Sequence, residues 1–153
     1  MSDAHKETLQ RVAEEQFEQL AFMFPVSAEE LPDGPPNFAA HAKVGFSGPS
    51  AGRVLLAAEG QILPPLAANM LGLDEGEPSE AEQTDALKEL LNVICGNLLP
   101  EIAGAEAVFD VQAPEVLDGP AEFEAACGRA GAVVADVNLD SGRARLVLLA
   151  DAR

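Results

Sequence analysis

The sequence has 153 residues, of which 48% are hydrophobic, and its 9 basic against 26 acidic side chains give a net charge of −17. A chain of this length fits one core, so we expect a single domain over residues 1–153. The negative charge would repel nucleic acid and anionic membranes, and no apolar run reaches the ~18 residues that span a bilayer. We therefore expect a globular, soluble protein that binds neither. A protein partner or a cationic ligand is compatible with this charge, although acidic surfaces more often serve solubility.

Segment 1–16 carries charges where a signal peptide needs a continuous apolar stretch, which favours a cytoplasmic protein. Cys95 and Cys127 are too few for a disulfide framework or a metal-binding set, so we interpret both as buried free thiols. His5 lies near the terminus and His41 on the polar side of an expected strand. We expect both histidines at the surface, without a catalytic role.

The first expected element is a helix that begins at Ser2 or Asp3 and is stopped by Pro25. Its apolar residues follow the three-four spacing of one buried stripe: Leu9, Val12, Ala13, Phe17, Leu20 and Phe24. The cluster Phe22, Met23 and Phe24 is either part of the core or a dimer contact, and the sequence does not separate the two.

An antiparallel hairpin follows an exposed turn-forming connection rich in proline and glycine, residues 31–37. Apolar and other residues alternate over 38–46, with Ala40, Ala42, Val44 and Phe46 on the face expected to be buried. Residues 53–58 form the expected second strand of the hairpin.

Helical signals dominate the middle of the chain. Two prolines open a short helix over 64–71 that Gly72 ends, and an acidic linker, 74–80, follows. Ser79 and Glu82 have the spacing of a capping box at the start of a central helix, and Pro100 is expected to limit its far end.

Strand-like runs dominate the C-terminal part, at 107–112, 131–139 and 143–151, and residues 140–142 are a turn between the last two. Together these elements predict an α+β fold, in which a mostly antiparallel sheet packs against two long helices and one shorter helix.

The central helix has two contrasting faces. Its core stripe, about 100° wide, is made of Leu87, Leu90, Leu91, Ile94 and Leu98. Asp85, Glu89, Asn92 and Gly96 fall within roughly 60° on the opposite side. Glycine inside a helix costs about 0.5 to 1 kcal/mol relative to alanine, so Gly96 leaves room there for an approaching partner.

A Glu-x-x-Asn pair alone is also what an ordinary solvated helix face contains. Here its surroundings, residues 85–104, resemble the helix of the CheX, CheC and FliY phosphatases, in which an acidic or serine residue, a Glu, an Asn and a later Pro follow in order. Asp85, Glu89, Asn92 and Pro114 match that order, although the spacing from Asn92 to Pro114 is about one residue short. The first helix lacks a second Glu-x-x-Asn, so the sequence is more similar to CheX than to CheC.

The resemblance implies a CheC-like fold, a homodimer, and hydrolysis of the aspartyl phosphate of a CheY-like response regulator. It implies Glu89 and Asn92 as catalytic residues: Asn92 would position the attacking water, and Glu89 would contact a lysine of the regulator. Asp85 and Gly96 are the candidate binding residues. Asp85 could instead only stabilise the positive end of the helix dipole. No cofactor is expected on this chain, because the family implies that the regulator supplies Mg²⁺.

Two other functions are compatible with the same residues. A homologue that keeps the fold and the pair could serve as a non-catalytic adaptor for a regulator. A structural protein of the flagellar switch is the third alternative, but FliY-like relatives carry additional domains that 153 residues do not accommodate.

Overall fold

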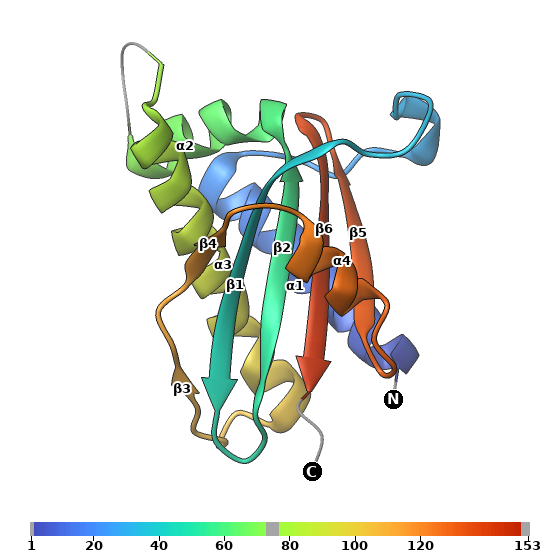
Figure 1. The fold of residues 1–153 in the computed structure, drawn as a ribbon, viewed down its shortest axis with the longest axis vertical. Coiled ribbons are helices and arrows are strands. Elements are labelled where there is room, and N and C mark those ends of the chain that lie inside the picture. Colours follow the sequence, from blue (N-terminus) through green and yellow to red (C-terminus); the bar gives the residue numbers. More distant parts are fainter. Residues whose placement is uncertain (1, 73–76, 151–153) are drawn as a thin grey trace.

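The computed structural model describes residues 2–72 and 77–150. An antiparallel sheet is covered on one face by three helices and on part of the other face by a fourth (Figure 1). The helices are α1 (Ser2–Ala21), α2 (Leu63–Leu71), α3 (Glu80–Ala103) and α4 (Ala121–Cys127), with short 3-10 turns at Ala28–Glu30 and Gly60–Ile62. The strands are β1 (Phe38–Ser47), β2 (Gly52–Glu59), β3 (Asp110–Val111), β4 (Glu115–Leu117), β5 (Val133–Leu139) and β6 (Gly142–Ala150). The predicted α+β architecture is confirmed.

The strand order is β3-β1-β2-β6-β5, and β4 pairs with β1 farther along the same edge as β3. The expected hairpin of β1 and β2 is present, with Val44 opposite Val54. The second expected hairpin joins β5 and β6 through a turn at 140–141. The last residue expected in it, Asp151, lies outside the described residues.

The helix α1 ends earlier than expected. Phe22 takes a left-handed conformation with φ of 55°, and this reverses the chain before Pro25. Met23 then turns inward and is buried, whereas Phe22 and Phe24 are 66% and 46% exposed. The predicted apolar stripe is therefore correct up to Leu20 but does not include Phe24, and the aromatic cluster divides between core and surface.

The start of α3 is as predicted. Ser79 Oγ accepts from the N–H of Glu82 at 3.1 Å, and Glu82 Oε1 accepts from the N–H of Ser79 at 2.9 Å, which completes the capping box. The prediction for its far end was wrong, because Pro100 lies inside the helix, which continues to Ala103 and is capped by Gly104. Residues 74–76 of the acidic linker before α3 lie outside the described residues.

Segment 104–130 differs most from the sequence-based expectation. The strand expected at 107–112 is reduced to the two residues of β3, because Val108 turns outward and is 80% exposed. The helix α4 was not predicted, since seven residues rich in alanine and glutamate give too short a periodic pattern. Phe123 and Ala126 of α4 are buried against Leu55 and Val147 of the sheet.

This second core corrects two predictions. His41 is 5% exposed and not at the surface, because α4 covers the outward face of β1 and the His41 ring lies 5.6 Å from that of Phe123.

Cys95 is fully buried as expected, but Cys127 at the end of α4 is only half-buried. Burial raises the pKa of the Cys95 thiol to about 11. His5 is half-buried.

An enclosed ion pair fastens the proline-rich connection to the sheet. Arg143 Nη2 lies 3.1 Å from Glu59 Oε2, and the guanidinium also donates to the carbonyls of Gly34 and Pro35. Glu59 in turn accepts from the N–H of Asn37. Burial alone would raise the pKa of Glu59, but these hydrogen bonds and the charge of Arg143 together lower it.

Candidate functional site

The candidate site lies on the side of α3 that faces away from the core. The helix packs against α1, α2 and β1, and its buried residues include Leu87, Leu91 and Ile94. Figure 1 shows α3 beside the edge of the sheet formed by β1, β3 and β4. Because the core stripe fixes the rotation of α3, the residues on its other side are directed outward.

All four predicted site residues share this outward side. Asp85, Glu89 and Gly96 are exposed, and Asn92 between them is half-buried. Glu89 and Asn92 are three residues apart, the spacing at which neighbouring side chains on a helix meet. The structure thus brings the predicted residues together on one face.

The amide of Asn92 is available to a ligand. Within residues 2–72 and 77–150 no hydrogen bond involves the side chain of Asn92 or of Glu89. Asn97, by contrast, donates from its amide to the carbonyl of Val93 at 2.8 Å. An amide both donates and accepts, so Asn92 can hold one water molecule through two complementary contacts.

Asp85 lies beyond the first turn of α3, where a carboxylate would stabilise the helix dipole. The acidic residues of the first turn are Glu80 and Glu82, and the dipole effect fades beyond that turn. The carboxylate of Asp85 lies 3.9 Å from Nζ of Lys88, a loose and solvent-exposed ion pair. Asp85 therefore adds one negative charge to the rim of the site while holding Lys88 nearby.

Gly96 and Pro100 form a feature that the sequence analysis missed. Pro100 has no N–H, so the carbonyl of Gly96, four residues earlier, has no intrahelical donor. A side chain at Gly96 would meet nothing within 4 Å. Both residues line a hollow of about 470 Å³ together with Asn97, Glu101 and Ala105. The sequence did contain a pattern that predicts this exposed backbone acceptor, namely a glycine four residues before a proline within a helix.

Pro114 lies in the connection between β3 and β4 and is half-buried. Both of these short strands contact α3, so the segment that carries Pro114 borders the helix along its length. The motif proline therefore belongs to the region beside the site, on a separate element from Glu89 and Asn92.

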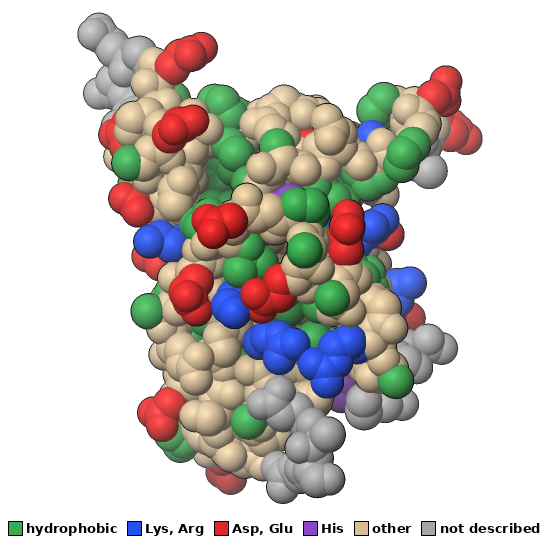
Figure 2. Space-filling view, in the orientation of Figure 1, with side chains coloured by type: hydrophobic (Ala, Val, Ile, Leu, Met, Phe, Trp, Pro, Cys, Tyr) green, Lys and Arg blue, Asp and Glu red, His purple; other side chains and the backbone are tan. Residues whose placement is uncertain are grey.

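Acidic side chains dominate the region where α3 begins, and blue basic side chains gather on the lower part of the face that carries α4 (Figure 2).

No helix in the described part of the chain has the length and hydrophobicity of a membrane span. Residues 2–72 and 77–150 also hold no group of three or more His, Cys, Asp or Glu side chains arranged to bind a metal ion.

The fold of the chain is similar to those of several proteins of known structure. The chain has the fold of a CheX from Desulfovibrio desulfuricans, with a TM-score of 0.71 and 15% identity over 97% of this chain and 99% of that one. It is also similar to a CheC-like superfamily protein from Shewanella, with a TM-score of 0.68 and 18% identity over 99% and 100% of the two chains.

A third similar structure is the complex of CheX, CheY, BeF3 and Mg²⁺ from Borrelia burgdorferi, with a TM-score of 0.67 and 15% identity over 95% of this chain and 97% of the matched one. None of the curated proteins compared with this sequence matches it. The fold is that of the CheC-like class. The family model for the chemotaxis phosphatase CheX matches residues 40–137, more than half of the sequence, and the chain belongs to this family.

Proposed function

We propose that this chain, acting as one CheX-like domain, hydrolyses the aspartyl phosphate of a CheY-like response regulator. The single observation that carries the proposal is the face of α3, where Glu89 and the unpaired amide of Asn92 lie one turn apart on a helix of a CheX family member. The CheX from Borrelia burgdorferi forms a complex with CheY, which supports a regulator of that kind as the partner.

In this mechanism Asn92 positions the attacking water. Hydrolysis of an acyl phosphate is a phosphoryl transfer, for which placing the nucleophile in line and stabilising negative charge are the main requirements. The amide oxygen of Asn92 accepts a hydrogen bond from an O–H of the water, the NH₂ can donate one to the water oxygen, and no proton is transferred to the amide. Asn92 is thus a catalytic residue that acts by positioning.

Glu89 docks and orients the regulator. Its exposed carboxylate can accept a charge-assisted hydrogen bond from a lysine of the partner. Gly96 lets the partner's backbone approach, and its free carbonyl offers a further acceptor beside Asn92. Mg²⁺ comes with the regulator in this proposal. The Borrelia complex contains Mg²⁺.

We also propose that the chain forms a homodimer. Val111 and Val116 are exposed on β3 and β4. These two short strands pair with β1 on one side, and their other side is an edge of the sheet. An edge with exposed apolar side chains is suited to pairing with another copy.

Phosphate release from a phosphorylated CheY-like regulator with Mg²⁺, measured with and without this protein, tests the proposed activity. Faster release supports a phosphatase. Binding to several phosphorylated regulators without faster release would instead assign the chain to the non-catalytic adaptors.

A further inference from the structure

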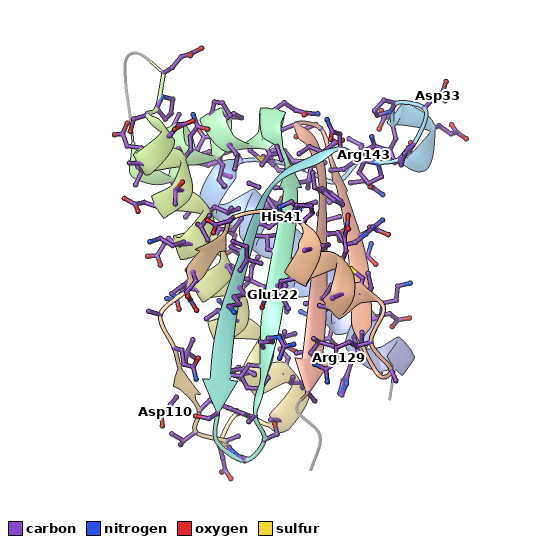
Figure 3. All side chains as sticks on the ribbon, in the orientation of Figure 1. Asp33, His41, Asp110, Glu122, Arg129 and Arg143 are labelled. Carbon is purple, nitrogen blue, oxygen red and sulfur yellow. The ribbon has the colours of Figure 1, made fainter. Side chains whose placement is uncertain are left out.

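Lys88 carries the single positive charge in the sequence of α3. The acidic residues that share this helix with it are Glu80, Glu82, Asp85, Glu89 and Glu101. Figure 3 labels Arg129 and Arg143 toward the right of the view, well away from α3 at the left edge of the sheet. Lys88 is therefore the cation that α3 itself brings to the side of the molecule where Asn92 lies.

Helix geometry makes Lys88 a neighbour of Asn92. The two residues are four apart in the sequence, a spacing at which Cβ atoms on one helix face lie about 5–6 Å apart. Side chains of an α-helix lean toward its N-terminus, so the side chain of Asn92 extends over the turn that carries Lys88 and Glu89. Asn92 thus has an ammonium group on one neighbour and a carboxylate on the other.

The ammonium group of Lys88 is loosely held. Its Nζ lies 3.9 Å from Oδ1 of Asp85, and none of the hydrogen bonds within residues 2–72 and 77–150 involves it. The other ion pairs between described residues are 3.3 Å or shorter, as in the 2.9 Å pair of Lys43 and Glu122. The Lys88 side chain is 37% exposed, and an exposed pair of this length contributes little to stability. Lys88 can therefore exchange Asp85 for another anion at small cost.

The proposed reaction brings an anion to an acidic surface. An aspartyl phosphate that approaches α3 meets the charges of Asp85 and Glu89, on a chain with a net charge of −17. The phosphoryl group spreads its negative charge over its oxygens during transfer, and a lysine ammonium group is a common ligand of phosphate oxygens. Lys88 has three donors on a flexible stem of four carbons, so it can reach the space over Asn92.

We propose that Lys88 is a third catalytic residue of this site, an inference that rests on the proposed phosphatase function. Its ammonium group leaves Asp85 when the regulator docks and donates hydrogen bonds to the phosphoryl oxygens, beside the water held by Asn92. The bond from phosphorus to the aspartyl oxygen breaks as the bond to the water oxygen forms, and the water protons leave with the phosphate. Lys88 keeps its own protons throughout. Glu89 docks the regulator, whereas Lys88 recognises its phosphoryl group.

Binding of a regulator loaded with Mg²⁺ and beryllofluoride, an analogue of the phosphoryl group, tests this contact without turnover. We expect the unmodified protein to prefer the loaded over the unloaded regulator, and Lys88→Gln to lose about tenfold of that preference. Lys88→Arg should retain it, because the cation remains. Lys6→Gln makes the same change at an exposed lysine of α1 and is the matched control. An unchanged preference in Lys88→Gln, or no preference in the unmodified protein, would overturn the proposal.

Phosphate release separates the role of Lys88 from the phosphatase function itself. Lys88→Gln should lower kcat about tenfold with a smaller effect on KM, because it removes a contact to charge that develops in the transition state. Glutamine favours helix as lysine does, so the thermal unfolding temperature should not change. Acceleration by the unmodified protein with an equal kcat for Lys88→Gln would refute the role of Lys88 alone. No acceleration by the unmodified protein would refute the phosphatase function and this role together.

Discussion

Pro100 lies one helical turn after Gly96 on α3, and the missing N–H of the proline leaves the Gly96 carbonyl without its intrahelical donor. The pair lies on the same outward side as Glu89 and Asn92. Side-chain groups and a backbone acceptor are therefore presented together to an approaching protein.

Substitutions at Gly96 should separate stability from activity. Gly96→Ala is expected to raise the free energy of unfolding by about 0.5 to 1 kcal/mol, because the position is helical and the added Cβ meets nothing. Gly96→Gln should be similarly well folded but slower in phosphate release, since its side chain occupies the docking face. Chemical denaturation and the release assay measure both quantities. A fully active Gly96→Gln protein would remove Gly96 from the docking face.

Glu89→Gln should weaken productive docking without weakening the fold. A charge-assisted hydrogen bond is worth about 1.5 to 3 kcal/mol, so we expect KM for the phosphorylated regulator to rise about tenfold or more. The exposed carboxylate contributes little to the free energy of unfolding, about 0.5 kcal/mol or less. Asp85→Asn removes one negative charge from the same face, so comparison with it shows how much of the change in KM is specific to Glu89. Equal kinetics for Glu89→Gln and the unmodified protein would exclude the proposed contact.

Glu59→Gln should destabilise the protein by about 3 kcal/mol, because it leaves Arg143 enclosed without its counter-charge. The hydrogen bonds of Glu59 lower its pKa in the folded state. Its contribution is therefore present above the ordinary pKa of 4.5 and is lost as the pH falls through the lower, folded-state pKa. Urea denaturation between neutral and acid pH measures this, and the difference between the two proteins should narrow in acid. A difference that grows on acidification would contradict the assignment.

The proposed homodimer predicts twice the mass of the chain in light scattering. Replacing Val111 and Val116 by lysine should shift the protein to monomers, because charged residues oppose pairing at a sheet edge. Phe22→Ser, at an exposed aromatic away from that edge, is the control and should leave the mass unchanged. A monomer at all working concentrations would rule out the dimer.

The central part of the fold was predictable from the sequence because its signals are local. Ser79 and Glu82 define the start of α3, and strict alternation of apolar residues defines β1. The rotation of α3 followed from the leucine stripe, which is why the outward position of Glu89 and Asn92 could be predicted.

The errors arise where tertiary contacts override local preference. His41 was predicted to face solvent because it lies on the polar side of β1. The short helix α4, which was not predicted, covers that side and buries the imidazole. Pro100 lies inside α3 because the buried residues Leu98 and Leu99 on its N-terminal side hold the last turn against the core, an effect of packing that the local preference of proline does not reveal. Cys127 is only half-buried because it lies at the end of α4, whose core contacts are made by Phe123 and Ala126.

The most direct test of the account compares phosphate release from a phosphorylated CheY-like regulator with Mg²⁺ in the presence of the unmodified protein, Asn92→Ala and Asn97→Ala. Asn97 is the matched control, since it is an asparagine of the same helix whose amide is bonded to Val93. The account predicts that Asn92→Ala binds the regulator, unfolds at the normal temperature and gives no acceleration, while Asn97→Ala remains active. Acceleration by Asn92→Ala equal to that of the unmodified protein would contradict the central claim.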